Sequence, residues 1–257
     1  MVYTVVTKRK PHDATGRTAI ELAWGWGDRP RPGPRPSLNL KQIVDATVAL
    51  ADAEGIEAVS MQRVAEGVGV TPMALYRYVG SKDDLIFLAV DAAAGAPPPS
   101  PANRGRWRAA VERWARGQLD LLTAHPWVVQ VPVTDPPLGP NQVAWMERFL
   151  ESISGSGLHE ADQLGVLNLL SGYVLGHVRL YADLTQGARV RGLTREEAER
   201  RYMETIRRVI DTALFPRVAA AFEAASAVPS EDARADFEFG LARILDGVEA
   251  MARPRGL

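Results

Sequence analysis

The sequence predicts an all-α fold in which an N-terminal three-helix helix-turn-helix domain is followed by a C-terminal helical bundle. First, apolar residues recur at helical spacing through most of the chain after residue 38. Second, Ser, Thr and Asn caps open these stretches, while Gly and Pro close them. Third, no stretch shows the apolar–polar alternation of a convincing β-strand. Together these observations favour helices packed on helices.

The composition narrows the classes of protein that this chain can be. With 257 residues, of which 46% are apolar, it can bury a sizeable core. The absence of cysteine excludes disulfide scaffolds, thiolate metal sites and cysteine nucleophiles. No apolar run approaches the roughly 20 residues of a membrane span, and the N-terminus lacks the pattern of a secretory signal. We therefore expect a cytoplasmic protein without a membrane partner.

Charge is distributed unevenly along the chain. Residues 1–39 hold seven Lys or Arg against three Asp or Glu, a formal charge of +4, which leaves −5 for the rest. Residues 1–37 lack helical periodicity and end in Arg-Pro repeats that favour extended polyproline II. We predict a flexible basic arm there, in which Arg29, Arg31 and Arg35 could lie in a DNA minor groove; the alternative is a solvated linker. Its two tryptophans, Trp24 and Trp26, are expected to pack on the protein's own surface rather than on bases.

Residues 38–94 are predicted to form the first folded domain. Each of its helices has a recognisable start, and a Gly67–Gly69 turn separates the second helix from the third. The start signals are Asn39 with Gln42 in a capping box, Ser60, Thr71 followed by Pro72, and Ser81, and the third helix is expected to end near Val79.

A linker over residues 95–105, rich in Pro, Gly and Ala, separates this domain from a second one over residues 104–257. The second domain is expected to be helical throughout. Its predicted segments are about 106–123, 126–131, 140–154, 159–185, 194–214, 216–226 and 231–252.

Residues 60–79 have the pattern of a helix, a tight glycine turn and a short second helix. In such a unit the second helix lies in the major groove of DNA while the first braces it. Apolar groups on its outer face suit thymine methyls, hydroxyls suit phosphate oxygens, and cations suit guanine or phosphate. On composition alone, an ordinary helical hairpin with solvated aromatic residues is an equal alternative. The expected contact residues are Thr71, Pro72, Met73, Ala74, Tyr76, Arg77 and Tyr78, with Lys82 at the start of the next helix.

Several runs of residues within 38–92 also form a recognisable series, namely Ile43–Ala46, Leu50–Gly55, Val64–Val70, Leu75–Val79 and Ser81–Leu85. This series resembles the DNA-binding domain of the tetracycline-repressor (TetR) family. Further along, His125-Pro126-Trp127 and Gly139-Pro140-Asn141 resemble the C-terminal domain of the tetracycline-repressor-like branch.

The resemblance implies partners and site residues. A regulator of this family is expected to bind double-stranded operator DNA as a homodimer, whose two chains meet through helices at about 159–185 and 231–252. It is expected to act as a repressor that a small-molecule effector releases from the operator. Family contacts to DNA also fall on Ser60, Met61 and Gln62, although Met61 is unusual where a hydroxyl or a charge could meet DNA.

A ligand cavity in the C-terminal domain is implied by the same resemblance, and a role in the ordinary core is the alternative for each residue assigned to it. No cofactor or metal is expected, because the four histidines lack paired spacing. Hydrolase, P-loop and zinc-protease motifs do not occur, so we do not expect an enzyme. The competing function is a helical ligand-binding module that acts without binding DNA. The candidate ligand residues are Trp127, Trp145, Asn168, Tyr173, His177 and Tyr181.

Overall fold

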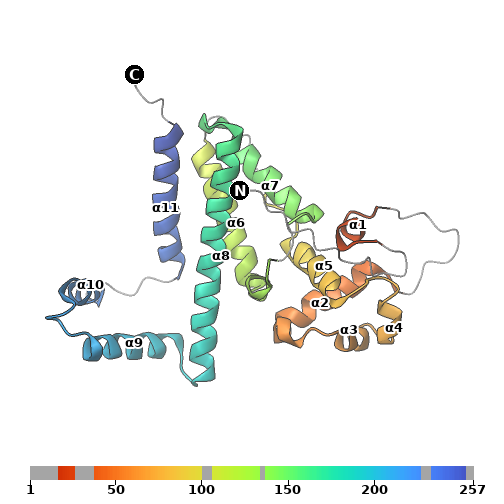
Figure 1. Cartoon of the computed structure of the whole chain (residues 1–257), viewed down its shortest axis with the longest axis horizontal. Helices are drawn as coiled ribbons and strands as arrows, with labels where there is room; N and C mark the ends of the chain where they lie inside the picture. The colour runs from red at the N-terminus through yellow and green to blue at the C-terminus, as the bar shows by residue number, and fades with distance from the viewer. Residues whose placement is uncertain (1–16, 27–37, 100–105, 134–136, 227–232, 253–257) are drawn as a thin grey trace. The chain divides into compact units, whose positions relative to one another are not determined.

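The computed structural model describes residues 17–26, 38–99, 106–133, 137–226 and 233–252, and the regular structure in these ranges is helical without a strand (Figure 1). The predicted all-α class is therefore confirmed. The chain divides into two compact units, Met1–Gly155 and Ser156–Leu257, which we describe one at a time. No helix in the described ranges is both long enough and apolar enough to cross a membrane.

The first unit contains α1 to α7, and most of its helices begin at predicted caps. The Asn39 side chain accepts from the Gln42 amide at 2.9 Å, and Ser81 accepts from the Asp84 amide at 3.0 Å. The helices are α1 (Ala19–Ala23), α2 (Leu40–Glu54), α3 (Met61–Gly67), α4 (Pro72–Leu75), α5 (Lys82–Ala94), α6 (Trp107–Ala124) and α7 (Pro140–Ile153), with short 3₁₀ turns at Ile56–Ala58 and Val128–Gln130. A third 3₁₀ turn, Ser154–Ser156, follows α7 and includes the first residue of the second unit.

Helix α1 lies in a stretch where we expected no helix, and that expectation was wrong for residues 19–23. Thr18 and Glu21 form a reciprocal capping box, with the Glu21 carboxylate 2.7 Å from the Thr18 amide. Leu22 is buried, and α1 packs on α5. The Trp24 indole donates to the Leu138 carbonyl at 2.8 Å, so Trp24 packs on the protein's own surface, as we expected.

The five helices from α1 through α5 share one hydrophobic core with the segment that follows α6. Ile43, Leu75, Val79 and Leu85 are fully buried at its centre. Trp127, from the segment between α6 and α7, is 1% exposed and belongs to the same core. The helix-turn-helix region is therefore completed by a residue from beyond the proline-rich linker.

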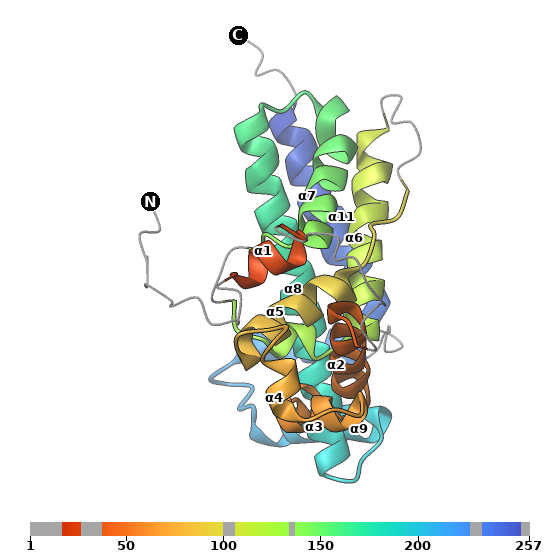
Figure 2. The ribbon, with the colours of Figure 1, turned by 90° about the vertical axis from the view of Figure 1, so that its right-hand side faces the viewer.

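Helices α6 and α7 pack on each other through aromatic side chains. The rings of Trp114 and Phe149 meet edge to face, with centroids 4.9 Å apart, and both are buried. The Trp114 indole donates to the Trp145 carbonyl at 2.9 Å. These contacts fix the two helices as a pair (Figure 2).

The second unit contains α8 (Glu160–Val190), α9 (Arg195–Val209), α10 (Pro216–Ser226) and α11 (Ala233–Ala252). Helix α11 packs on α8, where the rings of Phe237 and Tyr173 stack with centroids 5.4 Å apart. Gly240 permits this approach, because a Cβ there would lie 2.2 Å from the Tyr173 hydroxyl. Helices α9 and α10 pack on each other beyond the end of α8 (Figure 1).

The second unit exposes large apolar side chains on α8 and α11. Along one face of α8, a Cβ added at Gly165, Gly172 or Gly176 would meet no atom of another described element of this unit within 4 Å. Large apolar side chains flank this face, which we call the open glycine face of α8. They include Leu169, Leu175 and Leu180 on α8, while Phe239 and Met251 are exposed on α11.

Candidate nucleic-acid interface and effector domain

The turn between α3 and α4 is closed by backbone hydrogen bonds. The Val70 amide donates to the Ala65 carbonyl at 3.0 Å, and the Gly69 amide donates to the Glu66 carbonyl at 3.2 Å. Gly69 has a φ of +70°, a left-handed conformation that glycine adopts without strain. The turn therefore fixes the direction in which α4 leaves α3.

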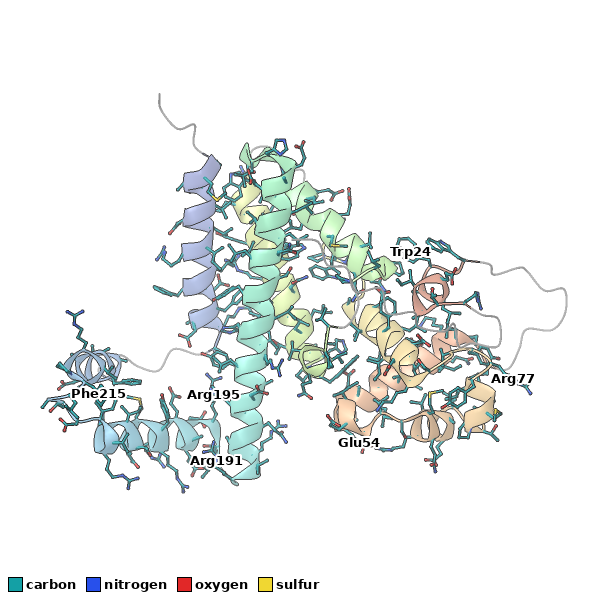
Figure 3. The ribbon with its side chains drawn as sticks, in the orientation of Figure 1. Trp24, Glu54, Arg77, Arg191, Arg195 and Phe215 are labelled. Carbon is teal, nitrogen blue, oxygen red and sulfur yellow. The ribbon has the colours of Figure 1, made fainter. Side chains whose placement is uncertain are left out.

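Helix α4 is shorter than the predicted segment, since it ends at Leu75 and continues as turns to Val79. Its inner side is held by the buried Leu75 and Val79. Its outer side presents Met73, which is 71% exposed, Tyr76, which is 41% exposed, and Arg77 (Figure 3). Thr71 and Pro72 are exposed beside them, and Lys82 is exposed at the first position of α5.

Several residues of the predicted DNA contact set are buried or partly buried. Met61 is 9% exposed and belongs to the core, because α3 turns this position inward. The Tyr78 hydroxyl donates to the Leu38 carbonyl at 3.0 Å, which joins the end of α4 to the start of α2. Ala74 is half-buried. Our proposed DNA surface therefore rests on the exposed members of the set.

The remaining candidates on α3 lie at its start. The Ser60 hydroxyl accepts from the Arg63 amide at 3.2 Å and so caps the helix. Gln62 is exposed and donates to the Glu66 carboxylate at 3.0 Å. The Arg63 guanidinium is bound by the Glu54 carboxylate at 2.9 Å, and this hydrogen bond lowers the pKa of Glu54. Arg63 is thus turned toward α2.

The arginines of the basic arm, Arg29, Arg31 and Arg35, lie outside the described residues. The described residues on either side of this stretch are anchored. Leu22 on one side and Leu38 on the other are buried in the same core. The described chain before and after the arginines is therefore part of one folded core.

The six predicted ligand residues are divided between the two units. Trp127 and Trp145 belong to the first, where both are buried and have hydrogen-bonded indoles. Asn168, Tyr173, His177 and Tyr181 belong to α8 in the second, where Asn168 is exposed. Their role as ligand residues stays a prediction.

Three of these residues form one cluster on α8. The His177 ring lies 4.6 Å from Tyr181 and 5.4 Å from Phe237, centroid to centroid. Burial lowers the pKa of His177, which favours the neutral imidazole. Burial, reinforced by the hydrogen bond to Asp236, raises the pKa of Tyr181 to about 12, so its hydroxyl stays protonated and donates to that carboxylate. The guanidinium of Arg195 lies 5.1 Å from the Tyr181 ring.

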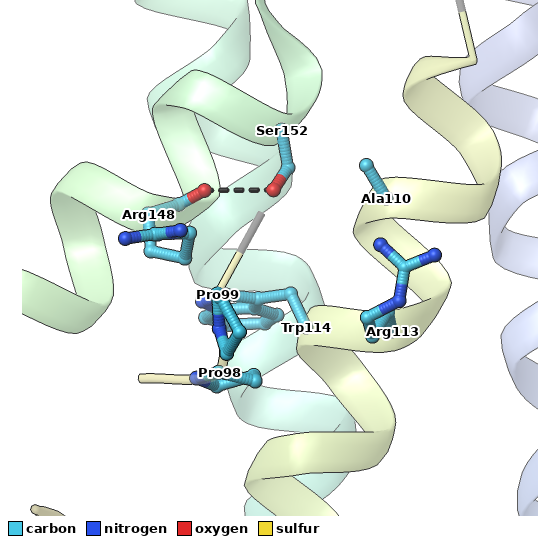
Figure 4. A pocket seen from close by; sticks show the side chains of 7 residues that line it. All are labelled: Pro98, Pro99, Ala110, Arg113, Trp114, Arg148 and Ser152. Atoms are coloured by element: carbon cyan, nitrogen blue, oxygen red, sulfur yellow. Dashed lines mark hydrogen bonds between the residues drawn. The ribbon is translucent and has the colours of Figure 1, made fainter. Parts of the chain in front are cut away.

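Two of the pockets formed by the described residues lie elsewhere, and neither of these two is lined by the predicted ligand residues. One, between α6, α7 and the linker, has room for about one water molecule, at about 10 Å³, beside Trp114, Arg113 and Arg148 (Figure 4). The other, of about 290 Å³, lies between α9 and α10, with Met203 and Phe222 among its apolar walls.

Comparison with known proteins places this arrangement in a family. Residues 43–89 match the family model of bacterial regulatory proteins of the tetR family, and residues 98–252 match that of the tetracyclin repressor-like C-terminal domain. The HTH-type transcriptional repressor DrrR1 of Streptomyces coeruleorubidus is 39% identical over 92% of this chain and 86% of its own length. The chain belongs to the TetR family.

Solved structures agree with this assignment. The TetR-family protein ActR of Streptomyces coelicolor, in complex with actinorhodin, has a TM-score of 0.69 and 26% identity over 86% of this chain and 99% of its own. ActR in complex with (S)-DNPA has a TM-score of 0.66 and 26% identity, over 86% of this chain and all of its own. This TetR-family protein is therefore a DNA-binding regulator of transcription, and the alternative of a ligand-binding module without DNA binding is not supported.

Two carboxylates of this TetR-family regulator have roles that the sequence analysis missed. One oxygen of Asp52, near the end of α2, accepts from the Trp127 indole at 2.7 Å and lies 2.7 Å from His125 Nδ1. Asp91, on α5, bonds to residues at the start of α7. The two tripeptides of the C-terminal resemblance, residues 125–127 and 139–141, thus both contact helices of the DNA-binding domain. Their family pattern was a signal, but only the fold supplies the partners.

Proposed function

We propose that this TetR-family regulator binds a roughly palindromic operator as a homodimer, represses transcription there, and is released by a small-molecule effector. The observation that carries the proposal is the outer side of α4, where exposed contact groups stand on a short helix anchored by the buried Leu75 and Val79. Because it acts on DNA, we place it in the cytoplasm.

Each exposed group on this surface suits one part of a DNA duplex. Met73 offers an apolar surface to thymine methyls, and Arg77 can reach guanine or phosphate. The hydroxyls of Thr71 and Tyr76 suit phosphate oxygens. Lys82 adds a cation at the N-terminus of α5, where backbone N–H groups attract phosphate. The basic arm would add contacts in the adjacent minor groove.

The proposed dimer follows from the geometry of DNA and the surface of the second unit. Two recognition helices must meet major-groove faces about 34 Å apart, which one chain cannot do. The open glycine face of α8 and the exposed Phe239 and Met251 of α11 offer apolar surface for a second copy. We therefore propose that α8 and α11 of two chains form a four-helix interface.

The effector is proposed to be an aromatic small molecule. ActR has been solved in complex with actinorhodin, and the cluster of Tyr173, His177 and Tyr181 offers aromatic faces with polar ends. A screen of aromatic metabolites, scored by loss of DNA retardation, tests this part. If none of the aromatic compounds releases the protein from a DNA fragment that it retards, the proposal of an aromatic effector is contradicted.

The DNA surface is tested by measuring binding to a fragment upstream of the protein's own gene. We expect Arg77→Ala to weaken binding by about five- to a hundredfold and to relax the preference at one base position. Tyr76→Ala and Lys82→Ala should weaken binding to all sequences alike, since they contact phosphate.

Arg63→Ala is the matched control, because it removes the same charge from the same domain while its guanidinium is bound to Glu54. Its affinity should stay within about twofold of the wild type. Wild-type affinity in all three α4–α5 variants would contradict the proposed surface. Failure of the wild type to retard any fragment at low salt would favour the ligand-binding module instead.

A further inference from the structure

Helix α7 begins without a side-chain cap from the residue that precedes it. The first N–H groups of a helix need acceptors outside the helix, and the preceding residue usually supplies one. Here that residue is Gly139, which has no side chain, and Asp91 of α5 takes its place. Asp91 Oδ1 accepts from the Gln142 amide at 3.0 Å, and Oδ2 accepts from the Asn141 side-chain amide at 3.2 Å.

The carboxylate fits only because residue 139 is glycine. A Cβ at Gly139 would lie 2.1 Å from Asp91 Oδ1 and 2.3 Å from Asp91 Cγ, far inside contact distance. The backbone of Gly139, with φ −71° and ψ 154°, is open to any residue, so packing rather than conformation requires the glycine. Asp91, at 4% exposure, and Gly139 are therefore a matched pair.

A second contact joins the same two helices, and in this one a side chain of α7 binds backbone groups of α5. The Trp145 indole of α7 donates to the Ala94 carbonyl at 2.9 Å and to the Gly95 carbonyl at 3.2 Å, where α5 ends. The last carbonyls of a helix also lack partners within it. Each helix thus satisfies terminal backbone groups of the other.

The other end of α5 lies beside the recognition helix. Leu85 and Leu88 of α5 share a core with Leu75 of α4, and Lys82 stands on the proposed DNA surface. Asp91 is nine residues further along the helix, about 14 Å at 1.5 Å per residue. Helix α5 therefore connects the recognition helix to the start of α7.

We propose that Asp91 is a positioning residue through which α7 sets the orientation of the recognition helix α4. The proposal rests on the proposed function in one respect, namely that α4 contacts DNA. A shift at the start of α7 reaches α4 because the Asp91 cap joins it to α5. By linkage, DNA bound at α4 must in turn restrain the start of α7.

This reciprocity can be measured without knowing the effector. Amide hydrogen exchange of the full-length protein is followed with and without a double-stranded fragment from upstream of its gene. In the wild type we expect bound DNA to slow exchange at Asn141 and Gln142 by about five- to tenfold. The paired change Asp91→Gly with Gly139→Ser moves the cap onto the chain of α7 itself, since serine is a good N-cap.

The variant with the moved cap should show near wild-type exchange at Asn141 and Gln142 without DNA, and no slowing when DNA binds. Asp91→Ala alone, which removes the cap and keeps a good helix former in α5, should speed exchange at these amides by about tenfold, and should also speed exchange along α5. Gly155→Ala, whose added Cβ meets nothing within 4 Å, is the control and should change neither.

Bound DNA without slowing in the wild type, or slowing that persists after the cap is moved, would overturn the proposal. A wild type that binds no DNA would instead contradict the proposed function. In that case Asp91→Ala alone decides the coupling, because unchanged exchange along α5 would refute it and faster exchange there would support it.

Discussion

At the scale of single residues, Asp91 is the one carboxylate among the described residues that is buried, at 4% exposure. Burial raises the pKa of its carboxyl, while hydrogen bonds from Gln142 and Asn141 partly oppose the rise. A carboxyl with a higher pKa in the folded than in the unfolded chain binds its proton more tightly when folded. Its contribution to stability is therefore greatest below the unfolded-state pKa and is lost as pH rises through the folded-state pKa.

The raised pKa of Asp91 gives a prediction for Asp91→Asn, a variant that keeps the shape of the side chain and cannot ionise. As pH falls from about 7 to about 4, the free energy of unfolding of the wild type should rise relative to that of the variant. Urea unfolding at a series of pH values measures the difference. Asp45→Asn, which removes an exposed carboxylate from α2, is the control, and an equal trend in both variants would contradict the assignment to Asp91.

At the scale of elements, α1 changes the nature of the basic arm. Leu22 of α1 and Leu38 before α2 are both buried in one core, so the arginines between them belong to an internal segment rather than to a free end. Deleting residues 1–35 would therefore remove a helix from the core as well as the charges. Separating the two effects requires substitutions that leave α1 intact.

The triple variant Arg29→Gln, Arg31→Gln and Arg35→Gln meets this requirement. If the arm contacts phosphate or the minor groove, the slope of log K against log salt should become shallower by up to about 3, because each lost phosphate contact removes about 0.9. Titrations at several salt concentrations measure the slope. An unchanged slope with intact α1 would show that the arm does not take part in binding.

The elements also show how far sequence patterns reach. Caps at Asn39, Ser60 and Ser81 are local signals, and the corresponding helices start at the expected places. The box of Thr18 and Glu21 was equally present in the sequence, but it precedes a helix too short to show periodicity. The inward direction of Met61 depends on how α3 packs, which spacing alone did not resolve. The cap of α7 by Asp91 joins residues 50 positions apart, and no local pattern encodes it.

At the scale of the whole molecule, the proposed dimer depends on the open glycine face of α8. Glycine within a helix lowers its stability by about 1 kcal/mol relative to good helix formers, and no other described element of the second unit approaches Gly165, Gly172 or Gly176. A second helix that packs closely there would give these glycines a purpose, because the absence of a side chain lets two backbones approach.

Gly172→Leu separates the stability of one chain from the stability of the dimer. The folded chain should be as stable as before or more so, since leucine favours the helix and its Cβ meets no neighbour. The dissociation constant of the dimer, measured by sedimentation, should be about tenfold or more higher than that of the wild type. Ala220→Leu, at an exposed position of α10, serves as the control. If Gly172→Leu leaves the dimer unaltered, the interface does not include this face.

The burial of Trp127 among the residues of the helix-turn-helix domain has a consequence for building chimeric regulators. A transplant that joins a foreign effector domain at the proline-rich linker would leave a tryptophan-sized cavity in the donor's core and strip Asp52 and Asp91 of their partners. Cavities of that size cost several kcal/mol. The smallest DNA-binding module of this regulator that could be transplanted therefore runs to Gly155 and includes α6 and α7.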